Sequence, residues 1–251
     1  MKSDEPEAYI IGWQPFLGLK IYLDSRPLIP RPETEWWTEQ MLITLSSRES
    51  PDPFSVVRLG LAARSATENG SGDERHIRFL DLCAGSGAIG CAALARLSNA
   101  QVYFGEIDLA HEMIILKNIR ENKLDESPTF AEASAGKRAD VRIGDLFEPF
   151  GDIKFDIIAA NPPYIPVGRE LPVSVADYEP ALALYAGVDG LNIIRRIAAG
   201  LPKHLSPNGQ AWIECDSEYS DAACTLFEVQ GLRAEIRTDQ YDKPRVLRVV
   251  L

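Results

Sequence analysis

The chain contains 251 residues, of which 26 are Lys or Arg and 37 are Asp or Glu, so its formal net charge is −11. With 45% hydrophobic residues, it has the composition of a globular protein rather than a disordered or fibrous one. The acidic balance weighs against a protein that binds nucleic acid mainly by neutralising phosphates, because that mode needs a face of Lys and Arg. The length suits one α/β domain of roughly 200 to 250 residues.

The N-terminal region begins with two short apolar runs. Residues 9–12 and 16–23 are predicted to be strands around a turn at Gln14 and Pro15. The following segment, residues 26–32, contains three prolines, which exclude a helix there. We therefore expect a short β-hairpin followed by an irregular linker.

A helix is predicted next, from Thr34 to about Ser46, with the Thr34 hydroxyl as its N-terminal cap. Residues 47–76 are rich in polar residues, Gly and Pro, and residues 125–137 are similarly polar. Both stretches are predicted to be insertions at the surface.

From Ile77 onward, short apolar runs alternate with amphipathic stretches. This alternation predicts an α/β fold with a mostly parallel sheet that is covered on both faces. A ligand is then expected at the carboxyl ends of the strands, where the strand order reverses. The predicted strands are 78–83, 101–105, 139–143, 155–160, 210–214 and 245–251, and the predicted helices are 88–97, 109–122, 191–204 and 218–230.

A glycine-rich turn follows the first of these strands. Gly85 and Gly87 permit a tight turn at a helix start, where free backbone amides can approach a nucleoside ligand. Together with Gly90 they satisfy G-x-G-x-x-G, and Glu106, at the end of the next strand, could hold ribose hydroxyls, with Asp108 as the nearby competitor. These residues alone do not distinguish NAD from S-adenosylmethionine.

The sequence Asn161-Pro162-Pro163-Tyr164 directly follows the apolar strand 155–160. Two consecutive prolines stiffen the chain, so the Asn161 side-chain amide and the Pro162 carbonyl can be fixed side by side. A planar substrate nitrogen with two hydrogens can donate one hydrogen to each oxygen, and the Tyr164 ring can pack on the planar group. This pattern favours a methyltransferase acting on an amide or an exocyclic amine over a nicotinamide enzyme.

These motifs resemble those of class I S-adenosylmethionine-dependent methyltransferases. A narrower resemblance, to the HemK/PrmC family of protein-glutamine methyltransferases, is carried by residues 8–12, 16–19 and 28–35. Further matches are residues 178–180, 183–184 and 189–191, Glu214, Asp239 and residues 245–246. The resemblance covers the chain from about Ala8 to its C-terminus.

The resemblance implies a Rossmann-like fold: a mostly parallel seven-stranded sheet with a C-terminal antiparallel strand, preceded by a short β-hairpin. It implies a hairpin and linker over residues 1–33 and a catalytic domain over residues 34–251. Residues 31–35 would lie at the mouth of the site, with capping of the following helix as the alternative role of their acidic side chains. The implied cofactor-binding residues are Cys83, Ala84, Gly85, Ser86, Gly87, Glu106, Leu146 and Asn161, and the implied catalytic residues are Asn161, Pro162, Pro163 and Tyr164.

Three features depart from the family pattern. Cys83 replaces the usual first glycine of the loop, and Glu106 replaces the more usual aspartate. The helical recognition domain that precedes this segment in the family is absent, so either the chain is truncated or other elements recognise the substrate.

The expected function is S-adenosylmethionine-dependent methylation of the glutamine in the Gly-Gly-Gln loop of a peptide chain release factor. The alternatives are methylation of adenine or guanine amines in nucleic acid, and a catalytically silent methyltransferase-like subunit. We expect no direct nucleic-acid or membrane partner and a monomer, with a helper subunit as the alternative.

The four cysteines form no C-x-x-C pair and lie far from the three histidines, so no metal site is predicted. They are expected to be reduced thiols. The N-terminus has neither a secretory nor a transit pattern, which suggests a soluble cytoplasmic protein, with the mitochondrial matrix as the alternative.

Overall fold

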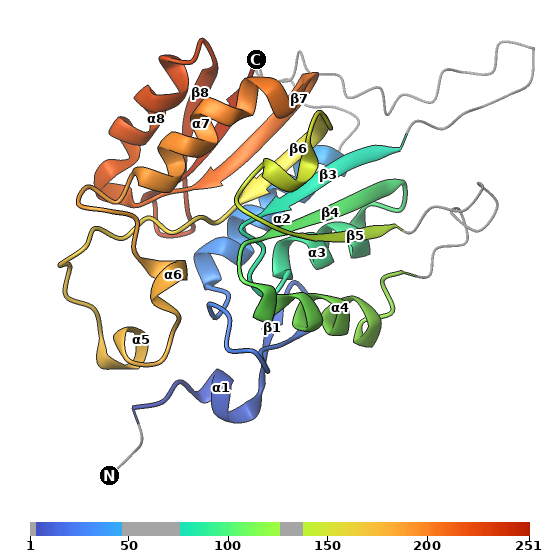
Figure 1. The fold of residues 1–251 in the computed structure, drawn as a ribbon, viewed down its shortest axis with the longest axis vertical. Helices are drawn as coiled ribbons and strands as arrows, with labels where there is room; N and C mark the ends of the chain where they lie inside the picture. The colour runs from blue at the N-terminus through green and yellow to red at the C-terminus, as the bar shows by residue number, and fades with distance from the viewer. Residues whose placement is uncertain (1–3, 47–75, 126–137) are drawn as a thin grey trace, which may run out of the picture.

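The computed structural model describes residues 4–46, 76–125 and 138–251. At its centre lies a seven-stranded sheet in the order β5-β4-β3-β6-β7-β9-β8 (Figure 1). The first five strands in this order are parallel, whereas β9 is antiparallel to both β7 and β8. The strands are β3 (Ile77–Leu82), β4 (Ala100–Glu106), β5 (Ala139–Ile143), β6 (Phe155–Ala160), β7 (Leu205–Glu214), β8 (Arg233–Thr238) and β9 (Pro244–Val250).

Helices cover both faces of the sheet because alternate strand residues are apolar on each side. Phe79 of β3 belongs to the core that includes the first group of helices, and its neighbour Leu80 belongs to the core on the opposite face. The first group is α2 (Pro32–Ser46), α3 (Ala88–Arg96) and α4 (Glu112–Glu121), and the second is α7 (Asn192–His204) and α8 (Ser220–Glu228). The predicted fold class is therefore confirmed.

The N-terminal hairpin consists of β1 (Trp13–Phe16) and β2 (Leu19–Tyr22), preceded by the short helix α1 (Glu7–Ile11). The predicted strand at 9–12 is therefore wrong, as is the turn at Gln14 and Pro15, which lie within β1. The hairpin turns instead at Leu17 and Gly18, whose φ angles of 49° and 83° suit a two-residue turn between antiparallel strands.

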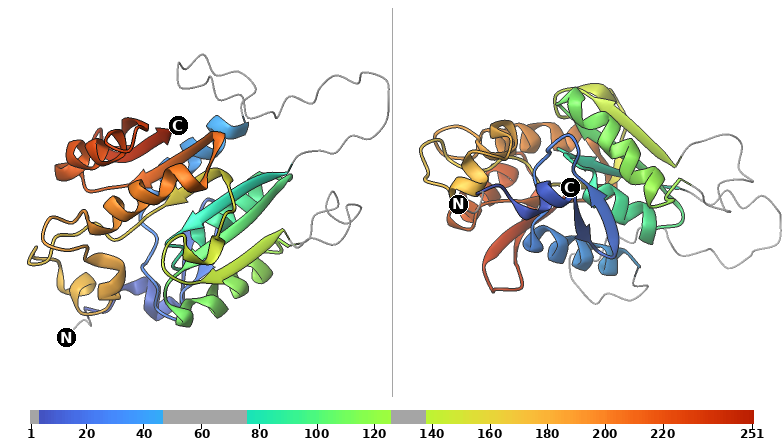
Figure 2. Two further views of the ribbon diagram at one scale, coloured as in Figure 1. Left: turned by 45° about the horizontal axis from the view of Figure 1, so that its top comes forward. Right: turned by 90° about the horizontal axis from the view of Figure 1, so that it is seen from below.

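The hairpin is held against α4 by side-chain amides. Asn118 accepts a hydrogen bond from the Tyr22 amide at 2.7 Å and donates to the carbonyls of Tyr22 and Ser86. One asparagine thus connects the hairpin, α4 and the glycine-rich loop. Figure 2 shows the hairpin between α4 and the segment that carries α5 (Val173–Ala176) and α6 (Ala181–Leu184).

Three further details differ from the sequence-based expectations. The edge strand β8 was not predicted, because charged residues alternate along it and it is only partly buried. Helix α2 begins at Pro32, which is favoured in a first helical turn, and Thr34 does not act as its predicted cap. Strand β7 begins at Leu205, five residues earlier than expected. The predicted insertions, 47–76 and 125–137, lie almost entirely outside the described residues.

Short 3-10 helices complete the fold: η2 (Leu109–His111), η3 (Glu148–Phe150) and η4 (Ser217–Tyr219). Within the described ranges, no helix combines the length and the apolar character needed to cross a membrane. All four cysteines are free thiols. Burial raises the pKa of each of these thiols above its usual value, so at neutral pH they are protonated.

Candidate functional site

The site lies where the strand order reverses. The chain proceeds from β3 outward to β4 and β5, then returns to β6 on the other side of β3. Leu82, the last residue of β3, pairs with Gly105 of β4 and with Ala160 of β6. The segments that follow these three strands therefore meet at one edge of the sheet, as expected for a ligand site in this class of fold.

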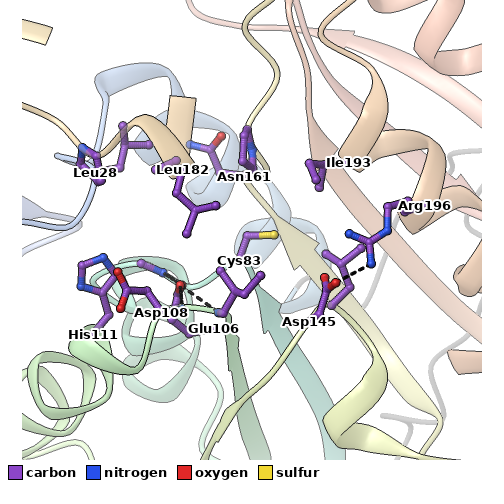
Figure 3. Close-up of a pocket in the computed structure, with 16 residues that line it drawn as sticks. Leu28, Cys83, Glu106, Asp108, His111, Asp145, Asn161, Leu182, Ile193 and Arg196 are labelled. Atoms are coloured by element: carbon purple, nitrogen blue, oxygen red, sulfur yellow. Dashed lines mark hydrogen bonds and ion pairs between the residues drawn. The ribbon is translucent and has the colours of Figure 1, made fainter. Parts of the chain in front are cut away.

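A cavity occupies this edge of the sheet (Figure 3). The strand ends at a switch point of an α/β sheet are where small ligands commonly bind. Of the residues predicted to bind a cofactor or substrate, those in the cavity wall are Cys83, Gly85, Glu106, Leu146, Asn161 and Pro163. Ala84, Ser86 and Gly87 belong to the same loop but lie behind the wall, and Pro162 and Tyr164 also lie outside it.

The loop depends on its glycines for two different reasons. Gly85 and Gly87 have φ angles of 55° and 76°, in the left-handed region that other residues adopt at a cost. Gly90 is needed for space, because a Cβ atom there would lie 2.2 Å from the Phe104 ring. Cys83 has a φ of 61° without being a glycine, which identifies it as the strained position of the loop.

Glu106 organises one side of the cavity through backbone amides. Its Oε2 accepts from the Gly85 amide at 2.7 Å, and its Oε1 accepts from the amides of Ile107 and Asp108 at 2.9 Å each. A carboxylate has about four lone-pair sites, so one on Oε2 remains for a further donor. Asp108 instead caps η2 by accepting from the Ala110 amide, which separates its role from that of Glu106.

The opposite side of the cavity carries the Asn161 amide, which Figure 3 shows across Cys83 from Glu106. Asn161 Nδ2 donates to Thr34 Oγ1 at 3.1 Å. The Tyr164 hydroxyl donates to Glu214 Oε1 at 2.9 Å, which anchors the far end of the motif. Burial and the adjacent carboxylate raise the pKa of Tyr164 well above its usual value, so this hydroxyl keeps its proton.

Glu214, at the end of β7, is almost completely buried. Its Oε2 accepts from Thr34 Oγ1 at 2.6 Å and from Trp37 Nε1 at 2.7 Å. Burial raises the pKa of Glu214, although these hydrogen bonds and the charge of Arg245 act in the opposite direction. Arg245 is itself paired with Asp239 at 3.1 Å, so a chain of alternating charges continues behind the site.

The rim of the cavity is closed by a contact between distant segments. Glu179 accepts from the Ile29 amide at 3.1 Å and forms an ion pair with Arg31. The neighbouring residues Leu28 and Pro180 both line the cavity. The irregular segment before α2 and the segment before α6 thus form one wall. Residues 31–35, which the resemblance places at the mouth of the site, do not line the cavity themselves, and Arg31 contributes to this wall through its ion pair with Glu179.

Sequence reasoning missed several residues of the wall. Asp145 and Arg196 form an ion pair at 2.7 Å across the cavity edge, and His111 contacts Ser25 Oγ at 2.9 Å. Asp145 directly precedes Leu146, which was predicted to bind the cofactor, so this adjacency could have indicated Asp145 from the sequence. Arg196 comes from α7, and nothing in its local sequence distinguishes it from other helix-surface arginines.

The strand order and the position of the cavity define the class I methyltransferase fold. In agreement, the solved structure described as "delta-N METTL16 MTase domain" superposes with a TM-score of 0.55 at 15% identity, covering 93% of this chain and 89% of that one. A family model described as "Conserved hypothetical protein 95" matches residues 65–175.

Sequence relatives define the family more narrowly. A "Release factor glutamine methyltransferase" of Rhodopirellula baltica is 31% identical over 233 residues, which are 92% of this chain and 68% of the relative. The chain therefore belongs to the release factor glutamine methyltransferase family, as the resemblance of its motifs indicated.

Other relatives have different names and lengths. A "Bifunctional methyltransferase" of Rickettsia felis is 31% identical over 92% of this chain, which spans only 42% of that protein. A "Ribosomal protein uL3 glutamine methyltransferase" of Bradyrhizobium diazoefficiens is 31% identical over 82% of this chain and 56% of its own length. The chain thus corresponds to about two fifths to two thirds of these relatives.

Proposed function

We propose that this protein binds S-adenosylmethionine in the cavity and methylates the side-chain amide nitrogen of the glutamine in a release factor's Gly-Gly-Gln loop. One observation carries the proposal: the Asn161 amide and the Glu106 carboxylate face one cavity from opposite sides, at the edge where three strands end. Family membership supports a glutamine amide as the acceptor.

The residues of the wall fit this cofactor. Glu106 Oε2 has a lone pair available for a ribose hydroxyl, and a Cβ atom at Gly85 would meet nothing closer than 4.0 Å, so the loop leaves open space. Leu146 offers an apolar surface for adenine. Arg196 pairs with Asp145, so the carboxylates of Glu106 and Asp108 give the cavity a net negative character that suits a sulfonium.

The protein's task is to position a poor nucleophile. S-adenosylmethionine supplies a methyl group that is already activated by its sulfonium. The lone pair of an amide nitrogen is delocalised into its carbonyl, so orientation and charge complementarity must provide most of the catalysis. Asn161 Oδ1, in the cavity wall, would accept one N–H hydrogen and stabilise the partly positive nitrogen. The second hydrogen would go to the carbonyl of the adjacent Pro162, although Pro162 itself does not line the cavity in this structure. The proton is then lost to water.

The alternative functions differ in the group that accepts the methyl. A nucleic-acid amine presents the same planar NH₂ group, but the net charge of −11 and the names of the relatives do not favour it. A uL3 glutamine is the second protein acceptor to consider, because one relative has that name. A silent subunit would not need the Asn161 and Glu106 arrangement.

The deciding experiment uses labelled S-adenosylmethionine with the full chain and three acceptors in separate reactions: a release factor, ribosomal protein uL3 and total tRNA. We expect label on the release factor, at the Gly-Gly-Gln glutamine after tryptic mapping. Label on RNA, or on none of the acceptors, would overturn the proposal.

We also propose that the protein acts as a monomer, with residues 34–251 as its catalytic domain, in the cytoplasm. Light scattering coupled to gel filtration would test the first point, because a dimer would elute with twice the mass of 27.8 kDa.

A further inference from the structure

The side chain of Asn161, which we propose holds the substrate NH₂ group, has two chemically different ends. The side-chain amide of Asn161 offers one acceptor, Oδ1, and one donor, Nδ2, in positions of nearly equal shape. A substrate NH₂ group can be held only if Oδ1 faces it, because a flipped amide would bring two donors together. The proposed function therefore requires something that fixes the orientation of this amide, and the following inference rests on that function.

The Thr34 hydroxyl is the group in contact with the amide. Its Oγ1 lies 3.1 Å from Asn161 Nδ2 and 2.6 Å from Glu214 Oε2. A hydroxyl carries a single hydrogen, and a carboxylate can only accept. Since that hydrogen is donated to Glu214, Thr34 has only lone pairs to offer Asn161. Only the Nδ2 end of the amide can pair with them.

Glu214 is fixed in its turn by groups that donate to it. Trp37 Nε1 can only donate, and it lies 2.7 Å from the same Oε2 atom. The Tyr164 hydroxyl occupies the other oxygen, Oε1, at 2.9 Å. The Glu214 side chain is 1% exposed, so water does not compete for these positions. The indole therefore holds Oε2 as an acceptor, and Oε2 takes the Thr34 hydrogen.

We propose that Thr34 is a positioning residue that holds the Asn161 amide with Oδ1 directed to the substrate, and that Glu214 sets the direction of the Thr34 hydroxyl. A flipped amide would place Oδ1 against the lone pairs of Thr34, which leaves two acceptors facing each other without a hydrogen. The hydrogen bonds that Trp37 and Thr34 donate to Glu214 thus determine which end of Asn161 faces the cavity.

The chain offers a matched set of variants on one helix. Thr34→Val keeps the shape of the side chain and removes the hydroxyl, whereas Thr34→Ser keeps the hydroxyl. Thr38→Val makes the same change one turn later in α2, at a buried threonine whose Oγ1 has no hydrogen-bond partner among the described residues. Thr38→Val therefore reports the effect of the substitution on packing alone.

With labelled S-adenosylmethionine and release factor, we expect kcat of Thr34→Val to fall about 10- to 100-fold, because Asn161 Oδ1 is then turned away from the substrate for most of the time. The Kd for S-adenosylmethionine, measured by calorimetry, should not change. Thr34→Ser should recover most of the kcat, and Thr38→Val should match the unchanged protein. Equal kcat values for Thr34→Val and Thr38→Val would overturn the proposal.

A second measurement needs no substrate and separates this inference from the proposed function. The side-chain NH₂ signals of Asn161, assigned by their loss in Asn161→Asp, should exchange slowly in the unchanged protein and in Thr34→Ser. They should exchange faster in Thr34→Val, and equal exchange in all three proteins would contradict the assigned orientation. If the orientation is confirmed but no acceptor is methylated, the proposed function alone fails.

Discussion

The two halves of the cavity are held in place by different kinds of group. On the proposed cofactor side, Glu106 binds backbone amides, and its contact with Gly85 spans only 21 residues of sequence. On the acceptor side, side chains bind one another over long separations: 127 residues between Asn161 and Thr34, and 180 between Thr34 and Glu214. The first half is a local motif, and the second is a tertiary assembly.

This difference determines which amino-acid substitutions each half tolerates. Backbone amides are present whatever the side chains are, so the cofactor half depends mainly on loop conformation and on one carboxylate. The acceptor half depends on the identity of each side chain, because every member donates or accepts in a fixed direction. Substitutions should therefore affect binding in one half and turnover in the other.

The largest effect is expected from Asn161→Ala. It removes the proposed acceptor for the substrate NH₂ group, and kcat should fall by about 100- to 1,000-fold or more. The Kd for S-adenosylmethionine, measured by calorimetry, should stay close to that of the unchanged protein. A variant that remained active would disprove the role of Asn161, and a variant that lost the cofactor would show that the halves are not separable.

The variant Glu106→Ala tests the proposed cofactor half of the cavity. The proposed hydrogen bond of Glu106 to the ribose is lost, and a hydrogen bond to a charged group is worth about 1.5–3 kcal/mol, so the Kd for S-adenosylmethionine should rise about 10- to 100-fold. The backbone amides of Gly85, Ile107 and Asp108 also lose their acceptor. At saturating cofactor, kcat should fall much less. Asp108→Asn keeps a capping side chain and serves as the comparison; a larger loss for Asp108→Asn would assign the ribose to Asp108.

The pH dependence of kcat should reveal the protonation of Glu214. Burial raises its pKa above the usual range of glutamates, so its protonation begins at a higher pH than for an exposed glutamate. A proton on Oε2 would reverse the Thr34 hydroxyl and misorient Asn161. We expect an acidic fall in kcat that disappears in Glu214→Gln, and a fall that persists in this variant would contradict the assignment.

The raised pKa of Glu214 also predicts how the stability of the fold changes with pH. The folded state binds the Glu214 proton more tightly than the unfolded state, so this contribution to stability is present at low pH and lost as the pH rises through the folded pKa. Glu214→Gln cannot ionise. Relative to the unchanged protein, its free energy of unfolding in urea should therefore increase as the pH is raised over that interval.

The smallest effect concerns the strained loop position. In Cys83→Gly the left-handed backbone no longer carries a Cβ atom, and we expect a gain of about 0.5 kcal/mol in unfolding free energy. Cys224→Gly, at a similarly half-buried cysteine inside α8, should instead lose about 1 kcal/mol. Urea unfolding of both variants checks the contrast, and equal losses would mean that Cys83 is not strained.

The sequence predicted that the glycine-rich loop and Glu106 lie together, because they are close in sequence and follow neighbouring strands. The glycine spacing and the position of Glu106 at a strand end placed both in one wall before any tertiary contact was known. Strand β8 was missed because its alternating charges are typical of a polar surface segment as much as of an edge strand. The hairpin turn was misplaced because Pro15 has the composition of a turn residue, although the left-handed angles occur at Leu17 and Gly18.

On the proposed acceptor side, the sequence predicted the Asn161 segment at the end of a strand but not the side chains that hold it. Thr34 was interpreted as a helix cap, since a hydroxyl at a helix start usually caps and no local pattern indicates a partner 180 residues away. The ion pair of Asp145 with Arg196 was missed for the same reason. Long-range pairing of polar side chains leaves no periodic signal in a single sequence.

The contact of Glu179 with Ile29 and Arg31 has a consequence for the order of assembly. Its partners are about 150 residues apart, and the loop entropy of such a separation opposes early closure. During synthesis, the segment before α2 emerges long before Glu179 and waits without its partner. The nascent chain should thus form the local contact of Glu106 with Gly85 first and close this wall only after Glu179 has emerged.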